Sequence, residues 1–164
     1  MEKVLNKLIF EGKYFEAEKI VKKMSAKEQR DEIMNLAYGS ESIAVYSFLR
    51  YMTEKNKTQF WLDLTIDVMI NPLCFIEGAY SIALFHAREL LEINLSSKNL
   101  ERILFFYNIP EKLVENTEAK LVAKKIIEIE PDNIVALEIL KWTKEIVEEC
   151  KNGQVFRRIW WDFY

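Results

Sequence analysis

Histidine and cysteine are the residue types in this chain that most often carry chemistry, and they are scarce. His86 is the only histidine, and the two cysteines, Cys74 and Cys150, lie far apart in the sequence. A zinc site needs three or four ligands, so this set does not suggest one. Helical spacing places His86 on an apolar stripe, where a lone histidine is more often a hydrogen-bonded core residue than a ligand or a general base. We expect the core role.

Two aspartates, Asp63 and Asp67, are spaced four residues apart in the otherwise apolar stretch 58–70. On a helix this spacing puts both carboxylates on one face. Paired carboxylates can serve acid–base chemistry or bind a cation, but they can equally form a solvated strip or contact a partner protein. No Gly-rich phosphate loop, nucleophile elbow or kinase motif accompanies them. The sequence therefore predicts a chain without enzymatic activity, metal or cofactor.

The composition is that of a soluble globular protein. Of 164 residues, 50% are hydrophobic and 30% charged, which predicts one domain over residues 1–164. A formal charge of −3 argues against nucleic-acid binding and permits a basic protein partner. No apolar run approaches the ~20 residues that span a bilayer, and the first residues do not resemble a signal peptide. We therefore expect a cytoplasmic protein that does not bind membranes.

Apolar residues recur at helical spacing along the chain, with only four glycines and three prolines to interrupt them. This pattern predicts about nine helices joined by short polar turns. Ser25 and Glu28 have the spacing of a capping box at a helix start, and Gly12 and Asn71-Pro72 mark helix ends. The helix expected at 58–70 is apolar on nearly all sides, so we place it at the centre of the fold.

The segment from Ala119 to Leu140 is a partial copy of the segment from Ala83 to Leu104, at an offset of 36 residues. The residues shared by the two copies include Ala83/Ala119, Ala87/Ala123, Glu92/Glu128, Ile93/Ile129, Ile103/Ile139 and Leu104/Leu140. A period of this length is typical of helical hairpins that bury their apolar faces against one another. The fold class that we expect is all-α, a right-handed stack of antiparallel hairpins.

The repeat resembles the tetratricopeptide family, which uses small and large residues in alternation on its second helix and a proline after it. The matching positions are Ala119, Ala123, Ile126 and Pro131, with Ala83, Ala87 and Leu90 in the upstream copy. The Trp, Leu, Gly and Tyr of that family's first helix are missing from both copies, as is the paired basic clamp of its peptide-binding members. The resemblance implies an α-solenoid that binds protein.

A second resemblance extends over residues 86–93, 104–112 and 123–133, which are similar to small helical proteins of low-GC Gram-positive bacteria. Some members of that group are thought to be immunity proteins that neutralise polymorphic toxins. The resemblance implies a bacterial immunity protein whose partner is a basic toxin domain. The alternative is a tetratricopeptide-like adaptor or secretion chaperone that binds a peptide segment.

Acidic and aromatic side chains are the expected contacts with such a partner, because charges steer association and aromatic rings anchor interfaces. The candidate partner-binding residues are Asp63, Asp67, Glu145 and Glu149 for charge, with Trp161 and Tyr164 as anchors. The last two belong to the aromatic segment 155–164, for which we keep two interpretations. It either caps the open end of the helical stack or docks a partner.

Overall fold

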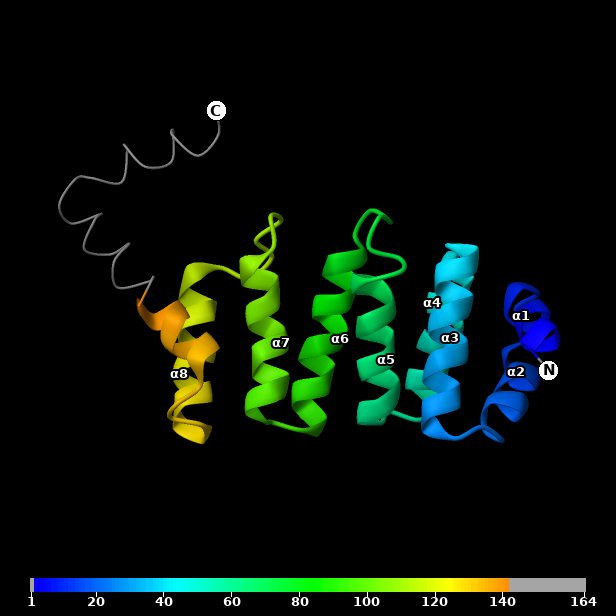
Figure 1. The fold of residues 1–164 in the computed structure, drawn as a ribbon, viewed down its shortest axis with the longest axis horizontal. Helices are drawn as coiled ribbons and strands as arrows, with labels where there is room; N and C mark the ends of the chain where they lie inside the picture. The colour runs from blue at the N-terminus through cyan, green and yellow to red at the C-terminus, as the bar shows by residue number, and fades with distance from the viewer. Residues whose placement is uncertain (1, 142–164) are drawn as a thin grey trace, which may run out of the picture. The chain divides into compact units, whose positions relative to one another are not determined.

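The computed structural model describes residues 2–141, and every regular element in that range is a helix (Figure 1). The elements are α1 (Glu2–Phe10), α2 (Tyr14–Val21), α3 (Ala26–Ser40), α4 (Ile43–Lys55), α5 (Gln59–Ile70), α6 (Ala79–Ile93), α7 (Ser97–Asn108) and α8 (Asn116–Ile129). A further helical stretch covers 134–141, up to the end of the described range. The prediction of an all-α chain is confirmed for these residues.

Local sequence signals set several helix boundaries. At the start of α3 the Ser25 hydroxyl accepts a hydrogen bond from the Glu28 N–H (3.3 Å), and the Glu28 carboxylate accepts one from the Ser25 N–H (2.7 Å). This reciprocal pair is the predicted capping box, which satisfies two backbone donors that a helix start leaves free. Gly12 lies in the turn between α1 and α2 and has a φ of +70°, a backbone conformation that glycine adopts without steric strain.

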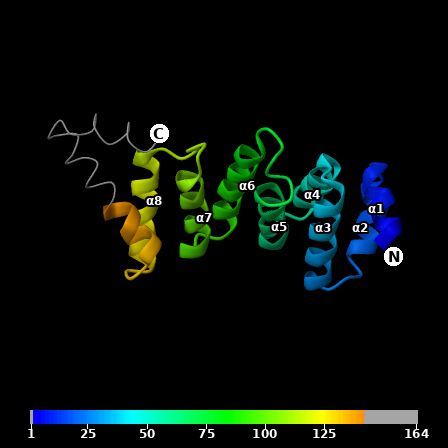
Figure 2. The same cartoon turned by 45° about the horizontal axis from the view of Figure 1, so that its top comes forward.

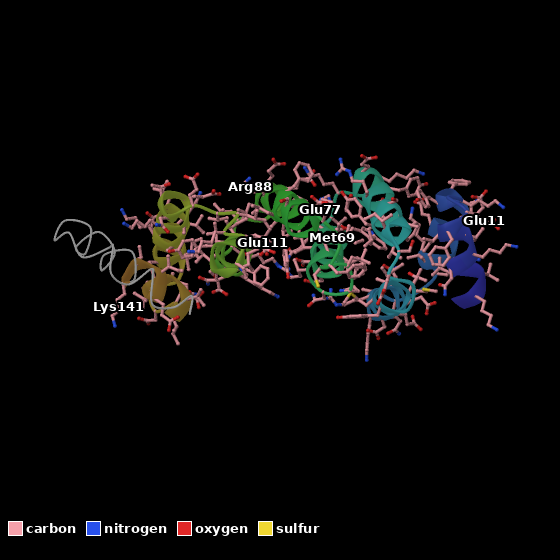
Figure 3. All side chains as sticks on the ribbon, turned by 90° about the horizontal axis from the view of Figure 1, so that it is seen from above. Glu11, Met69, Glu77, Arg88, Glu111 and Lys141 are labelled. Atoms are coloured by element: carbon pink, nitrogen blue, oxygen red, sulfur yellow. The ribbon has the colours of Figure 1, made fainter. Side chains whose placement is uncertain are left out.

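The chain divides into two compact units, and the boundary in the sequence lies between Asn94 and Leu95. The first unit contains α1 to α6, and α5 lies at its centre because it packs against α3, α4 and α6. Figure 2 shows α3, α4 and α5 side by side in this unit. Seven residues of α5 are buried, including Met69, which is labelled in Figure 3. The central position predicted for this helix is confirmed within its unit, while one domain over 1–164 stays a prediction.

The second unit is described from Leu95 to residue 141, and its core forms where α7 packs against α8. Phe106 of α7 and Ile126 of α8 are fully buried there. Asn133 starts the next helical stretch, because its side-chain oxygen accepts a hydrogen bond from the Ala136 N–H (3.1 Å). Its amide group also donates to the carboxylate of Glu101 on α7. One side chain thus caps the last described helical stretch and ties it to α7.

The two copies of the repeat have matching local structure. The helices α6 and α8 end at Ile93 and Ile129, which are 36 residues apart in the sequence. Positions buried in both copies are Ala83/Ala119, Ala87/Ala123, Leu90/Ile126 and Ile103/Ile139. The four alanines are fully buried in helices that pack closely, α6 against α5 and α8 against α7. A larger side chain at these positions would have to displace its neighbours. The two copies of the repeat therefore share the position at which a helix ends and the positions that are buried.

Between residues 2 and 141 no helix combines the length and the apolar character that crossing a bilayer requires.

We expect the substitution Ala123→Leu to lower the free energy of unfolding by about 1–3 kcal/mol, because three extra carbons must fit into a packed site. Ala123 is fully buried in α8, while Lys125 of the same helix is exposed. The matched control Lys125→Leu should change the free energy of unfolding by no more than about 0.5 kcal/mol. Urea unfolding followed by circular dichroism measures both. Equal effects of the two variants would contradict the packing described for α8.

Candidate functional site

The histidine and the cysteine that lie in the described range do not belong to a metal site. Among residues 2–141 no group of three or more His, Cys, Asp and Glu side chains could hold a metal ion. His86 is 0% exposed and hydrogen-bonded to two side chains, so its prediction as a core residue is confirmed. Cys74 is a partly exposed thiol in the segment after α5. A cavity of about 280 Å³ beside α1 and α3 is lined by Asn6, Phe10 and Glu32, among others.

The two aspartates of α5 lie on one side of that helix and are both partly buried. The carboxylate of Asp67 forms an ion pair with the Arg30 guanidinium of α3, and its side chain is only 14% exposed. One carboxylate oxygen of Asp63 is buried. The pair therefore offers little free carboxylate surface, although its role in partner binding stays a prediction. The other candidates, Glu145, Glu149, Trp161 and Tyr164, lie outside the described residues, as does the segment 155–164.

Glu18 of α2 forms a centre of polar contacts with α4. Its carboxylate accepts hydrogen bonds from the Tyr51 hydroxyl (2.9 Å) and the Lys55 ammonium (3.3 Å), both on α4, and pairs with Lys22 at 2.6 Å. The residue is 5% exposed. The hydrogen bond from Lys22, followed by those from Tyr51 and Lys55, lowers the pKa of Glu18 to about 2 against the opposing effect of burial. A carboxylate held in this way stays charged and fixes α2 on α4.

Exposed aromatic rings lie next to this centre, with cations above their faces. Phe15 of α2 is 54% exposed, and its ring centroid is 4.0 Å from the Lys19 ammonium and 5.2 Å from that of Lys55. The Lys55 ammonium also lies 4.9 Å from the centroid of Tyr51. Contacts of this length are within the range of cation–π attraction. Phe15 is thus a half-exposed ring with two lysine ammonium groups close to it.

The same arrangement recurs between α4 and α6. Phe85 of α6 is 51% exposed, and the Arg50 guanidinium of α4 lies 5.8 Å from its ring centroid. Arg50 also pairs with Glu54 (3.1 Å) and with Glu89 of α6 (3.6 Å). We use the name α2–α4–α6 surface for the residues of these two clusters: Phe15, Lys19, Tyr51 and Lys55 between α2 and α4, and Arg50 and Phe85 between α4 and α6.

Phenylalanine, tyrosine and arginine are residue types that often anchor protein–protein interfaces. The α2–α4–α6 surface has two exposed rings and three cations, and it contains no nucleophile paired with a base. Exposed rings and cations of this kind can contact the surface of another protein.

Sequence reasoning did not find the α2–α4–α6 surface. The four-residue spacing of Phe15 and Lys19 was a usable signal, because ring and cation then share one helix face. The contact of Arg50 with Phe85 had no such signal, since only the packing of α4 and α6 around α5 brings the two together.

Comparisons with protein-family models, with curated proteins and with solved structures found no match to this chain. A function can therefore be proposed only from the residues of this chain.

Replacing Glu18 by Gln should lower the free energy of unfolding at neutral pH by about 1–3 kcal/mol, because charge-assisted hydrogen bonds from two helices are weakened. The folded-state pKa lies below the ordinary value of 4.5, so this stabilisation is present above pH 4.5 and disappears as the pH falls through about 2. The difference between the wild-type chain and the variant, measured by urea unfolding, should therefore shrink steadily towards pH 2. Glu16→Gln, at an exposed position of α2, is the control. A difference that does not depend on pH would contradict the role given to Glu18.

Proposed function

We propose that this chain is a non-enzymatic protein-binding module built as a right-handed, tetratricopeptide-like stack of helical hairpins. The stack is supported by the repeat of buried positions in α6 and α8 and by contacts of α2 with α4 and of α3 with α5 in the first unit. Protein binding is supported above all by the exposed Phe15 and Phe85 rings with cations against them.

The proposed partner is a toxin domain, which the chain would neutralise as a bacterial immunity protein in the cytoplasm. The resemblance of residues 86–133 to such proteins and the formal charge of −3 support this choice. In this proposal acidic residues, including Asp63, Asp67, Glu145 and Glu149, steer the approach of a basic toxin. Trp161 and Tyr164 remain candidate anchors, and we add Phe15 and Phe85 from the α2–α4–α6 surface.

The second candidate is an adaptor or secretion chaperone that binds a peptide segment. One observation favours it specifically: Lys19, Lys55 and Arg50 lie beside the exposed rings of the α2–α4–α6 surface. Ammonium and guanidinium groups next to apolar rings suit a peptide that alternates acidic and apolar side chains.

Co-expression separates the two candidates. The chain is produced together with the toxic domain of a secreted protein encoded beside its own gene, and growth is measured. An immunity protein should restore growth and form a complex with a dissociation constant in the nanomolar range or below. Failure to restore growth, together with capture of a different protein by this chain from its native host, would replace the immunity proposal by the adaptor proposal. Neither result would overturn protein binding altogether.

Within the complex, the double substitution Phe15→Ala and Phe85→Ala should raise the dissociation constant at least tenfold, because buried aromatic anchors each carry about 2 kcal/mol or more. Tyr38→Ala and Phe75→Ala are matched controls, since these rings are 57% and 60% exposed and lie outside the α2–α4–α6 surface. Calorimetric titration should show less than threefold weakening for the controls. If Phe15→Ala with Phe85→Ala weakens binding no more than the controls do, the interface lies elsewhere, and Glu149→Lys then tests the acidic candidates.

A further inference from the structure

The chain's only histidine joins two helices through both of its ring nitrogens. His86 Nδ1 lies 2.8 Å from a carboxylate oxygen of Glu89 on α6, and Nε2 lies 3.3 Å from the Tyr46 hydroxyl on α4. An ionised carboxylate can only accept a hydrogen bond, so Nδ1 must carry the hydrogen. Nε2 is then the acceptor for the Tyr46 hydroxyl. A neutral imidazole therefore completes a chain of hydrogen bonds from α4 to α6.

The carboxylate beside His86 already has two cationic partners. Glu89 lies 3.6 Å from the Arg50 guanidinium and 3.6 Å from the Lys57 ammonium. Arg50 also pairs with Glu54, and Lys57 with Glu92, so four further charges surround the site from α4, α6 and the segment after α4. The helix α5 packs against both α4 and α6, but its Asp67 is turned to Arg30 of α3. These side chains carry three negative and two positive charges, so they do not by themselves oppose an imidazolium; burial of the ring is what opposes it.

Protonation would keep the hydrogen bond to Glu89 and reverse the other one, because Nε2–H would then donate to the Tyr46 oxygen. A hydrogen on Nε2 would point at the Tyr46 oxygen, so the hydroxyl could no longer donate to the ring and would need another acceptor. The imidazole is 0% exposed, so no water surrounds the new charge. Phe85, whose ring meets the imidazole edge to face at 5.1 Å, adds to this apolar wall. The neutral form is thus the one that the contact between α4 and α6 accommodates.

We propose that His86 is a proton-sensitive latch, which holds α6 against α4 when neutral and releases this contact when protonated in mild acid. The inference is independent of the proposed function. Because Phe85 and Arg50 belong to the two latched helices, release would also separate these members of the α2–α4–α6 surface.

The direction of the pH effect follows from the environment of the ring. Burial, more than any other cause, lowers the pKa of His86 below its usual 6.5; Arg50 acts in the same sense, and Glu89 opposes both. In the unfolded chain the histidine takes up a proton as the pH falls through about 6.5, while in the folded chain it does so only at a lower pH. Stability is therefore complete above pH 6.5 and declines below it. At pH 5.5 the unfolding equilibrium constant should have risen up to about tenfold from this group alone.

The test uses the full chain, because one histidine gives one unambiguous nuclear magnetic resonance signal. Titration of the imidazole C2 proton should give a midpoint below 6.5, and Glu89→Gln should move it lower still. Amide hydrogen exchange, corrected for the intrinsic pH dependence, should show that α6 loses protection between pH 7.5 and pH 5.5. The variant His86→Gln should lose this pH dependence, since glutamine does not titrate.

Two results would overturn the latch. One is a midpoint at or above 6.5, which would mean that the folded chain accommodates the imidazolium. The other is α6 protection that is equal at the two pH values in the wild-type chain. Both readings come from the wild-type chain, so the proposal remains testable even if His86→Gln does not fold.

Discussion

Three carboxylates of the first unit are largely buried. Each forms an ion pair with a cation on the second helix before or after its own. The ion pairs are Glu18 of α2 with Lys55 of α4, Asp67 of α5 with Arg30 of α3, and Glu89 of α6 with Arg50 of α4. A carboxylate that loses its hydration is tolerated only when its partners are in place. A rearrangement of alternate helices that separated these pairs would leave a largely buried carboxylate without its partner, which is costly.

The α2–α4–α6 surface depends on the same ion pairs. Lys55 and Arg50 reach the Glu18 and Glu89 carboxylates, and from there they lie over the rings of Phe15 and Phe85. The cations thus have two roles, because they compensate buried charge on one side and support exposed rings on the other. A partner that covers these rings would find them already held in place, which reduces the entropy lost on binding. In the proposed function the same side chains would serve both stability and recognition.

The helical character of the chain, the capping box at Ser25 and the burial of the repeat alanines could be predicted from the sequence, because each depends on residues close together along the chain. The central position of α5 was predictable too, since a helix that is apolar on all sides must be covered. The pairing of Asp67 with Arg30 and the exposure of Phe15 and Phe85 were not, because they depend on which helices pack together. The spacing of Asp63 and Asp67 gave their common helix face correctly but did not reveal that this face turns to α3.

Partly buried ion pairs and hydrogen bonds, together with apolar packing, hold alternate helices against one another. A double-mutant cycle between α2 and α4, with Glu18→Gln and Tyr51→Phe made singly and together, measures this coupling directly. The Tyr51 hydroxyl donates to the Glu18 carboxylate at 2.9 Å; Tyr51→Phe removes this donor, and Glu18→Gln replaces the charged acceptor by a neutral amide of similar shape. The account predicts a coupling free energy of at least about 0.5 kcal/mol in unfolding experiments at pH 7. Strictly additive effects of the two substitutions would contradict it.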